Sequence, residues 1–364
     1  MPQVNRSARP RSVETFYADT RNARRIVVLE PGVLGDTVHL LPALWTLREN
    51  YPDAEIHATC SPVGEKILRL AGCCDRLWPL QQSHAQRTLS EQFKVLRALR
   101  RLRIDASFNF NDNDRNTIHA AIVSARHRVG QNRGNWHFWS RFCIPNWHFA
   151  PPEDRQLPMY EQQRRLLEAC GMTLKPAKFN LTLPAEAHAW AAANVPAGAI
   201  HFAVNSSTHL REWPLDKWIE LGRRLLADNP ALEIVATGSP QARDAQRHEQ
   251  LIAGVNNPRL KVLQASPIEL AALFARCALQ IGGDSGALHL ALAMNTPTIA
   301  LYREYPTMAE WAPRGPRARV LSVPCSCIME KKAACDNAAT ARCMEHLPVE
   351  TVFAAVKDLL KATS

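Results

Sequence analysis

The sequence has no long apolar run. It contains no window of 18 consecutive apolar side chains among its 364 residues, and a helix needs about 20 such residues to cross a bilayer. The first 25 residues are polar and rich in arginine and lack the apolar stretch of a secretory signal. These absences predict a cytoplasmic protein in which the ten cysteines are reduced thiols.

The sequence also lacks the usual glycine-rich nucleotide-binding motifs. The segment 32–35 is Gly-Val-Leu-Gly, which is neither a Walker loop nor the G-x-G-x-x-G fingerprint. Asp112 and Asp114 have the spacing of an Asp-x-Asp metal motif, but they follow a strand of the first half and we interpret them as a polar loop. No cofactor is predicted, and no repeat of solenoid length is present.

Acidic residues are scarce in the first half of the chain. Residues 1–180 carry 26 basic and 17 acidic side chains and residues 181–364 carry 18 and 17, so the halves contribute +9 and +1 to the formal net charge of +10. Such a field attracts anionic partners over long distances. Charge alone leaves open a nucleic acid, a membrane surface, an acidic substrate or a merely soluble basic face. No nucleic-acid-binding motif is recognisable.

What the sequence does contain is a repeated alternation of short apolar segments with helical patterns. Strands are predicted at 25–30, 54–59, 106–110, 200–205, 232–237 and 279–282. Helices are predicted from Gly35 onward and at 62–71, 90–103, 160–170, 214–228, 267–276 and 285–294. This alternation predicts an α/β fold with a parallel sheet in each half of the chain.

Three turns between a predicted strand and the next helix are unusual, at 31–37, 205–214 and 282–289. In the last of them, Asp284 or Ser285 can cap the helix, and Gly286 leaves the amides of the first turn open to a phosphate. His289 lies in the first turns of the same helix and could face that ligand. A plain helix cap with a packed histidine explains these residues equally well.

The other two turns offer a cation and a carboxylate. Ser206, Ser207 and Arg211 follow a strand, and arginine is suited to a bidentate grip on a diphosphate, although Arg211 could equally be a solvated loop residue. Asp36 lies at a helix start beside Gly35, where it is either an N-cap or a general base held near a hydroxyl.

In combination these segments resemble glycosyltransferase family nine, the ADP-heptose:lipopolysaccharide heptosyltransferases. The resemblance runs from about residue 24 to the C-terminus and is carried by Gly35-Asp36-Thr37-Val38, Arg211-Glu212-Trp213-Pro214 and Asp284-Ser285-Gly286-Ala287-Leu288-His289. It implies a GT-B architecture, in which two Rossmann-like domains face each other across a central cleft.

The resemblance also implies the domain limits. We expect an acceptor-binding domain at 24–180 and a nucleotide-sugar-binding domain at 181–345. A flexible leader at 1–23 precedes them, and a helix within 346–364 packs back toward the N-terminal domain.

The reaction that the resemblance implies is an inverting, metal-independent transfer of heptose from ADP-heptose to a lipopolysaccharide core. Asp36 matches the family's catalytic aspartate, and Gly35 and Thr37 belong to the acceptor loop. The implied donor-binding positions are Ser206, Ser207, Arg211, Asp284, Ser285, Gly286 and His289. The expected partners are a nucleotide sugar, an anionic glycolipid acceptor and the inner-membrane surface, and not a nucleic acid.

Two departures from the family pattern keep alternatives open. Gln241 stands where the family often has a glutamate that helps to hold the nucleoside, and Glu-Pro-Gly-Val at 30–33 replaces a frequent Arg-x-Ser-Ser. One alternative is another nucleotide sugar or acceptor, including a protein, on the same fold. Another is a non-catalytic nucleotide-sugar-binding protein.

Two further segments have competing interpretations. Cys325, Cys327, Cys335 and Cys343 could hold a structural zinc ion, but the C-x-C spacing of the first pair is unusual, so we prefer reduced thiols and predict no metal. The aromatic and basic stretch 133–141 could contact a membrane or the acceptor, and an ordinary half-buried loop is the preferred interpretation.

Overall fold

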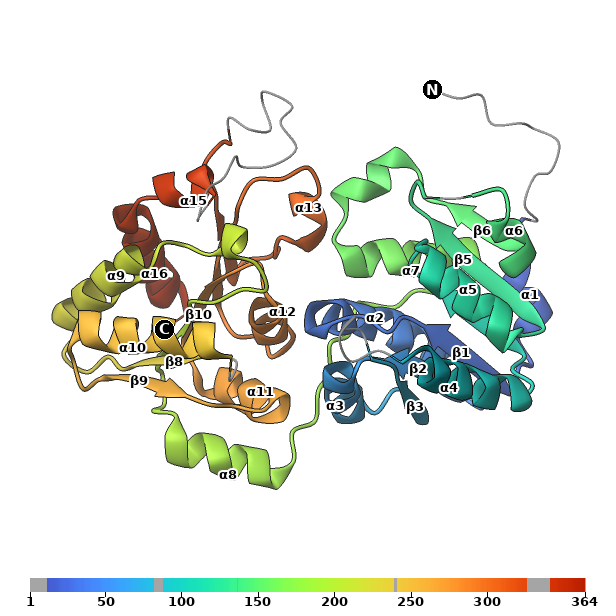
Figure 1. Cartoon of the computed structure of the whole chain (residues 1–364), viewed down its shortest axis with the longest axis horizontal. Coiled ribbons are helices and arrows are strands. Elements are labelled where there is room, and N and C mark those ends of the chain that lie inside the picture. The colour runs from blue at the N-terminus through green and yellow to red at the C-terminus, as the bar shows by residue number, and fades with distance from the viewer. Residues whose placement is uncertain (1–11, 82–87, 136, 239–240, 326–340, 364) are drawn as a thin grey trace. The chain divides into compact units, whose positions relative to one another are not determined.

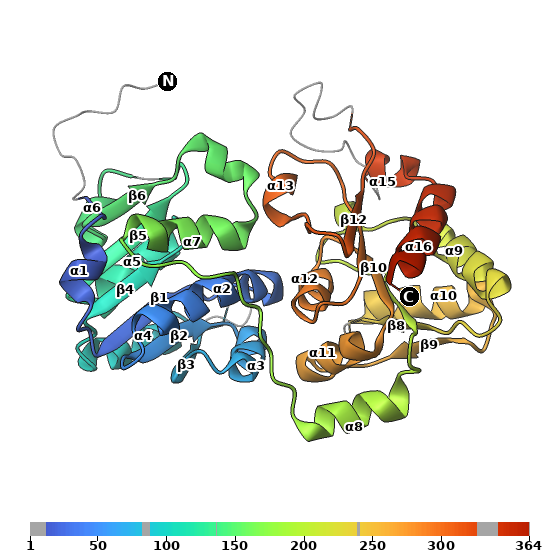
Figure 2. The same ribbon diagram turned by 180° about the vertical axis from the view of Figure 1, so that it is seen from behind.

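The computed structural model describes residues 12–81, 88–135, 137–238, 241–325 and 341–363. The chain divides into two units, residues 1–180 and 181–364, and each unit is built around a six-stranded sheet (Figure 1, and from behind in Figure 2). All neighbouring strands are parallel. The predicted α/β class with two parallel sheets is confirmed.

The first sheet has the strand order β3-β2-β1-β4-β5-β6. Its strands are β1 (Arg25–Leu29), β2 (Glu55–Cys60), β3 (Arg76–Pro79), β4 (Ala106–Asn109), β5 (His127–Asn132) and β6 (Asn146–Phe149). The helices of this unit are α1 (Phe16–Thr20), α2 (Leu34–Asn50), α3 (Pro62–Ala71), α4 (Leu89–Arg101), α5 (Asp114–Val123), α6 (Ser140–Cys143), the 3-10 helix η1 (Pro152–Gln156) and α7 (Met159–Ala169).

The second sheet has the order β12-β11-β10-β7-β8-β9. Its strands are β7 (Ile200–Ala203), β8 (Ile234–Thr237), β9 (Leu260–Leu263), β10 (Leu279–Gly283), β11 (Thr298–Leu301) and β12 (Ala318–Leu321). The helices are α8 (Ala185–Asn194), the 3-10 helix η2 (His209–Arg211), α9 (Leu215–Asp228), α10 (Ala242–Val255), α11 (Pro267–Arg276), α12 (Gly286–Ala293), α13 (Met308–Trp311), α15 (Arg342–His346) and α16 (Val349–Thr363).

Both sheets reverse their strand order in the same way. In each unit, the first three strands along the chain are added toward one side of the sheet and the last three toward the other side. This is the 3-2-1-4-5-6 order of dinucleotide-binding sheets. The reversal lies between β1 and β4 in the first unit and between β7 and β10 in the second. Ligands of such sheets bind beyond the carboxyl ends of the strands at this reversal.

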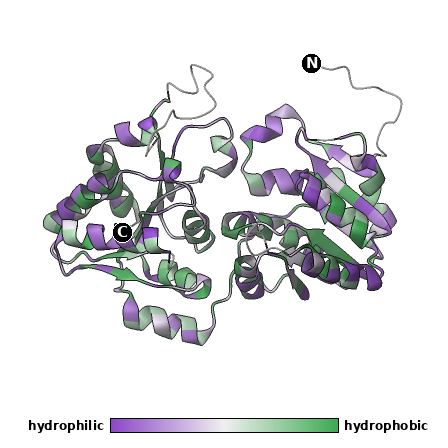
Figure 3. Cartoon of the chain, in the orientation of Figure 1, coloured by the Kyte–Doolittle hydropathy of each residue, from purple (hydrophilic) through white to green (hydrophobic). Residues whose placement is uncertain are grey.

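The strands are apolar because helices cover both faces of a parallel sheet. Strand β1 has the sequence Arg-Ile-Val-Val-Leu, in which Arg25 is exposed and the other four side chains are fully buried. Figure 3 shows the difference from the surface helices: β1 is coloured as hydrophobic, whereas α8 alternates between hydrophobic and hydrophilic residues. Helices α4 and α5 pack on the face of the sheet that includes Val27 and Leu29.

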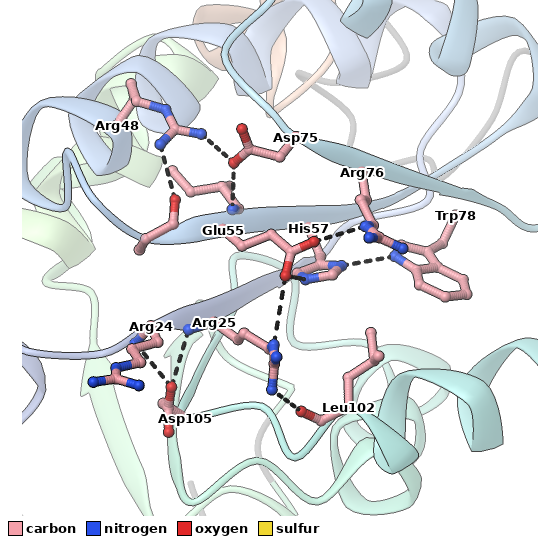
Figure 4. Close-up of polar contacts among 12 residues, drawn as sticks. Arg24, Arg25, Arg48, Glu55, His57, Asp75, Arg76, Trp78, Leu102 and Asp105 are labelled. Atoms are coloured by element: carbon pink, nitrogen blue, oxygen red, sulfur yellow. Dashed lines mark hydrogen bonds and ion pairs between the residues drawn. The ribbon is translucent and has the colours of Figure 1, made fainter.

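The amino ends of the first sheet's strands are joined by polar contacts (Figure 4). Asp105 accepts hydrogen bonds from the backbone N–H groups of Arg24 and Arg25, both at 2.9 Å. Glu55 forms ion pairs with Arg25 at 3.4 Å and Arg76 at 2.6 Å. These contacts link β1, β2, β3 and the segment before β4, and their partly exposed ion pairs contribute little each. These contacts join the amino ends of the strands, and ligands are expected at the opposite, carboxyl ends.

The predicted flexible leader is wrong for residues 12–23. Helix α1 lies in this segment, and its Phe16 is 3% exposed. The Phe16 ring contacts Phe108 of β4 with 5.5 Å between ring centroids, and the Thr20 and Tyr51 hydroxyls are hydrogen-bonded at 2.7 Å. The apolar side chains in this polar segment anchor it to the first unit. Residues 1–11 of the predicted leader lie outside the described residues.

The C-terminal helix α16 packs on the second unit. Helix α16 contacts α9 and β11, and its Val352, Val356 and Leu359 are fully buried in the core of the second unit. The turn before it is fixed to α9 as well, because Trp213 Nε1 and Lys217 Nζ donate to the Leu347 carbonyl at 3.1 and 2.9 Å. The apolar face of α16 is therefore buried within its own unit.

Candidate functional site

In the first unit, the turn from β1 to α2 holds Asp36 in a fixed place. Asp36 is the third residue of α2, and its Oδ2 accepts a hydrogen bond from the Val33 backbone N–H at 2.9 Å. A Cβ at Gly32 would lie 2.3 Å from the Asp36 Cβ, so this position admits only glycine. The helix dipole favours a negative charge in the first turn. The structure thus places a carboxylate at the reversal point of the first sheet.

A second carboxyl group, Glu30, lies directly after β1. It is 7% exposed, and burial, together with the charge of Asp36, raises its pKa to about 8 against the opposing effects of Arg115, Asn111 and Arg133. Glu30 is therefore largely protonated at neutral pH. In the sequence, Glu30 is part of a departure from the family pattern. Its position at the carboxyl end of a central strand is the signal that would have included it in the candidate site.

The two predicted acceptor-loop residues are both buried. Gly35 lies in the first turn of α2. Thr37 is 2% exposed and its hydroxyl donates to the Val33 carbonyl at 3.0 Å. A Cβ at Gly64 in α3 would lie 2.5 Å from the Thr37 Oγ1. Thr37 thus packs α2 against α3, and this contact argues against a direct contact between Thr37 and an acceptor.

In the second unit, the loop after β7 crosses the end of β10. A Cβ at Gly283 would lie 2.4 Å from the Arg211 carbonyl oxygen, and one at Gly282 would lie 2.7 Å from the Ala203 Cβ. Ser206 Oγ donates to the Asp284 carbonyl at 3.0 Å. The two glycines therefore allow the close approach that brings the second and third predicted turns together.

Asp284 is the centre of this cluster. It is 6% exposed, and its carboxylate oxygens lie 3.1 Å from Arg211 Nη1 and 3.5 Å from His289 Nε2. The hydroxyls of Tyr305 and Tyr302 donate to it at 3.0 and 3.4 Å. Burial by itself would raise its pKa, but the hydrogen bond of His289 and the charge of Arg211 hold the pKa below its usual value. Asp284 is therefore an ionised group that orients Arg211 and His289.

The start of α12 provides further groups for an anion. Ser285 occupies the N-cap position without a side-chain cap bond, and its buried Oγ has no hydrogen-bond partner among the described residues. Gly286 is the first residue of the helix, whose free amides and dipole favour an anion. The predicted Ser206, Arg211, Asp284, Ser285, Gly286 and His289 thus lie in one region. Ser207 is exposed in the same loop.

A buried glutamate in this loop was given no role from the sequence. Glu212 is 6% exposed, accepts a hydrogen bond from the Ser206 backbone N–H at 2.8 Å, and forms ion pairs with Arg243 and Arg247 of α10. Arg247 also donates to the Asn205 side chain at 2.9 Å. This network ties the loop to α10. The sequence lists Glu212 within its motif, but only the fold shows which arginines it meets.

Asp112 of the polar loop is a structural residue. Its Oδ2 accepts hydrogen bonds from the backbone N–H groups of Arg133 and Asn135 at 2.8 and 3.0 Å. It therefore anchors the start of the aromatic and basic stretch.

Within that stretch, the rings of His137 and Trp139 are stacked with 5.9 Å between centroids, and Phe138 is 69% exposed. Trp136 of the same stretch lies outside the described residues.

Two of the four cysteines considered as zinc ligands are among the described residues. Cys325 and Cys343 are buried, whereas Cys327 and Cys335 lie outside the described residues. Over the described ranges, no group of three or more His, Cys, Asp or Glu side chains is placed to hold a metal ion. In the same residues, every helix is too short or too polar to cross a bilayer.

The comparisons with known proteins agree with this geometry. A model of glycosyltransferase family 9 (heptosyltransferase) matches residues 92–340, which is more than half of the chain. Over 304 residues the chain is 23% identical to lipopolysaccharide heptosyltransferase 2 of Salmonella typhimurium, and the match covers 76% of this chain and 82% of that protein.

Two solved structures show the fold. ADP-heptose LPS heptosyltransferase II of E. coli superposes with a TM-score of 0.73 at 18% identity, covering 93% of this chain and 99% of the other. A glycosyl transferase of family 9 from Veillonella parvula gives 0.79 at 20% identity, covering 93% and 98%. These likenesses confirm the predicted α/β GT-B fold. The family match shows that this chain belongs to glycosyltransferase family 9, the heptosyltransferases, and that it is a glycosyltransferase.

Proposed function

We propose that this enzyme transfers heptose from ADP-heptose to a lipopolysaccharide core acceptor with inversion at the anomeric carbon, and that Asp36 is the general base. The observation that carries the proposal is the position of Asp36 at the reversal point of the first sheet, in a chain of family 9. The names of its relatives support the donor and acceptor, since one is a lipopolysaccharide heptosyltransferase and another is named for ADP-heptose.

The acceptor half of the reaction needs a base. The acceptor hydroxyl loses its proton to the Asp36 carboxylate while its oxygen forms a bond to the anomeric carbon of the heptose. Asp36 is held at the start of α2 by the Val33 N–H, so its carboxylate is oriented before the acceptor binds. The neighbouring Glu30, largely protonated because burial raises its pKa to about 8, adds no second full negative charge beside the base.

The donor half of the reaction needs a group that stabilises the leaving diphosphate. As the bond between the anomeric carbon and the phosphate oxygen breaks, negative charge develops on the ADP. Arg211 is 40% exposed beside Asp284, which leaves its guanidinium accessible to a diphosphate. The start of α12, with the Ser285 hydroxyl and the first-turn amides, offers hydrogen bonds to the same group.

The charge distribution supports an anionic glycolipid as acceptor. The first half of the chain, which contains Asp36, carries nine of the ten excess positive charges. A phosphorylated core glycan anchored in a membrane is an anionic partner of the kind that such a field attracts. We therefore propose that the enzyme works in the cytoplasm at the surface of the inner membrane.

The experiment is a transfer assay with the full chain. Incubation with ADP-heptose and a heptose-deficient lipopolysaccharide core should release ADP and add one heptose to the glycan, read by mass spectrometry of the product. A panel of other nucleotide sugars, tested by thermal shift and by product formation, checks the donor. ADP-heptose binding without transfer to any glycan or protein acceptor would favour a nucleotide-sugar-binding protein. Transfer from a different donor would show that the enzyme uses another nucleotide sugar on the same fold.

A further inference from the structure

An apolar groove lies between α4 and α5 on the first unit. Its cavity is about 640 Å³, within the range of ordinary ligand sites. Its apolar lining comes from both helices and includes Leu89, Phe93, Leu96, Ile118 and Ile122. The inner sides of the same helices are already used, because Leu96, Leu99, Ala120 and Val123 pack on the sheet. Leu96 belongs to both the core and the groove lining, so the groove opens outward from this core.

The rim of the groove exposes large apolar side chains to water. Leu89 is 73% exposed, Phe93 is 49% exposed and Ile118 is 47% exposed. Single exposed apolar residues are ordinary, but a group of them around a cavity is typical of a surface that meets a partner.

Basic side chains continue directly from this apolar rim. Leu89, Phe93, Arg97 and Arg101 follow one another at intervals of four residues and so form one row along α4. The first two are apolar and the last two are basic and exposed. The Arg97 guanidinium lies 5.9 Å from the centroid of the Phe93 ring, which places the two kinds of side chain in contact at the middle of the row.

The rest of α4 adds to this positive charge. Lys94 and Arg100 are also exposed, and Glu91 is the one acidic residue of the helix. Helix α4 thus carries four basic side chains against one acidic side chain beside an apolar groove. We infer that α4 and the α4–α5 groove are a docking surface for an anionic lipid bilayer. The groove takes acyl chains, and Lys94, Arg97, Arg100 and Arg101 contact the lipid phosphates.

The charges favour a bilayer over a second copy of the chain. Self-association through this face would bring the basic rows of two α4 helices together, and like charges repel. Anionic lipid headgroups offer the opposite charge next to the apolar phase that exposed leucine and phenylalanine side chains enter. Both features of the surface are therefore satisfied by one partner.

One residue of the groove lining also acts on the carboxyl group beside Asp36. Arg115 of α5 lines the groove, and its positive charge lowers the pKa of Glu30, beside Asp36. A bilayer docked on α4 and α5 would hold a lipid-linked acceptor near the carboxyl end of β1. In this respect the inference deepens the proposed function and rests on its lipid-linked acceptor, but the docking itself does not depend on which sugar is transferred.

The test is vesicle co-sedimentation of the full chain, without donor or acceptor. Vesicles of phosphatidylethanolamine and phosphatidylglycerol at 3:1 should bind the wild-type protein, and phosphatidylcholine vesicles should bind it much less. The double variant Leu89→Ser/Phe93→Ser should lower binding at least tenfold, because it removes two side chains that enter the apolar phase. Arg97→Gln/Arg101→Gln should lower it about thirtyfold and should reduce the dependence of binding on salt.

Matched control variants distinguish binding through this surface from nonspecific binding to vesicles. Ile252→Ser replaces an apolar side chain that is 47% exposed on α10, and Arg223→Gln replaces an exposed arginine on α9; both should bind vesicles like the wild type. Phe142→Ser tests the aromatic stretch, since Phe142 follows it and is 67% exposed. Hydrogen exchange should show vesicle-induced protection of α4 and α5 amides, a readout that does not require any variant to fold.

Three results would overturn the inference. The first is wild-type protein that binds anionic vesicles no better than neutral ones. The second is loss of binding in Phe142→Ser with retention in the Leu89/Phe93 variant, which would assign docking to the aromatic stretch. The third is a change of oligomeric state in the Leu89/Phe93 variant with vesicle binding unchanged, which would assign the groove to a second copy. Vesicle binding without heptosyl transfer would leave the docking surface standing and reject the proposed function alone.

Discussion

Each unit has a buried carboxyl group directly after one of the two strands that flank its sheet reversal, and the two groups are in opposite electrostatic states. Glu30 follows β1, and its pKa is raised to about 8 by burial and by Asp36. Asp284 follows β10, and its pKa is held below the usual value because His289, Arg211 and Tyr305 outweigh the effect of burial. Their exposures are similar, at 7% and 6%, so the neighbours decide the outcome.

This difference shows how one sheet topology supports two kinds of chemistry. In the first unit, the edge of the sheet carries a carboxyl pair, Glu30 and Asp36, suited to holding and moving a proton. In the second unit, the edge carries an ionised aspartate surrounded by an arginine, a histidine and two tyrosine hydroxyls. That arrangement orients positive groups and is suited to binding an anion.

The largest effect is expected at Asp36. If the first unit supplies the base and the second binds the nucleotide, Asp36→Asn should lower kcat by about 10²–10⁴-fold and leave the Kd for the nucleotide sugar unchanged. Steady-state ADP release and calorimetric titration of the donor measure the two quantities. Asp53→Asn, an exposed carboxylate in the loop before β2, is the matched control. A loss of donor affinity in Asp36→Asn would contradict the assignment of the base to the first unit and of nucleotide binding to the second.

The second largest effect is the pH dependence contributed by Glu30. Between its ordinary pKa of 4.5 and about 8, the native state holds one more proton than the unfolded state, so stability falls as pH rises through this range. Glu30→Gln removes that titration and should make the protein more stable than wild type by about 3 kcal/mol at pH 7. Below pH 4 the two proteins should be equally stable. Urea unfolding at a series of pH values measures this.

Asp284→Asn provides the opposite case. A lowered pKa contributes stability that is present above the ordinary pKa of aspartate and is lost as pH falls through that range. The variant should therefore be less stable than wild type at neutral pH, and the difference should shrink in acid. A gain of stability at neutral pH in both Glu30→Gln and Asp284→Asn would show that burial, and not the neighbouring charges, governs the pKa of both groups.

The helices with clear start signals could be predicted from the sequence. Helices α3 and α11 begin at Pro62 and Pro267, as expected, because a serine before each proline caps the helix by accepting the backbone N–H of the third helical residue. Strand β5 was missed because its sequence is polar. Its buried Gln131 donates through the side-chain amide to the Gln162 carbonyl at 2.9 Å, a contact that hydrophobic periodicity does not reveal.

The candidate site could be predicted where it lies within one turn of chain. Asp284 and Ser285 follow β10 directly, and Asp36 and His289 lie at the start of the helix after their strand. The rule that ligands bind beyond the carboxyl ends of strands therefore selects all four residues. Tyr305 was missed because it reaches Asp284 from 21 residues away. Likewise, the amphipathic pattern of α16 predicts a buried face but cannot name α9 and β11 as the elements that the helix contacts.

A smaller effect is expected at Arg211, which tests the anion-binding side of the comparison. Arg211→Gln removes the guanidinium beside Asp284 and should weaken nucleotide-sugar binding about 10- to 100-fold, the range of a lost charge-assisted hydrogen bond. Arg211→Lys should restore part of the affinity, since it keeps the charge but not the planar fork. Arg223→Gln on α9 is the control. Unchanged donor affinity in Arg211→Gln would make this arginine a partner of Asp284 alone.

The smallest effect separates a helix cap from a ligand site at Ser285. Ser266 caps α11 through its Oγ, so Ser266→Ala should cost about 1 kcal/mol of stability. The Ser285 Oγ makes no cap bond and has no partner among the described residues; Ser285→Ala should therefore leave the unfolding free energy within about 0.5 kcal/mol of wild type and weaken donor binding several-fold. The reverse pattern, with stability lost and donor affinity kept, would reduce the start of α12 to an ordinary helix cap and leave Arg211 as the anion-binding group of the second unit.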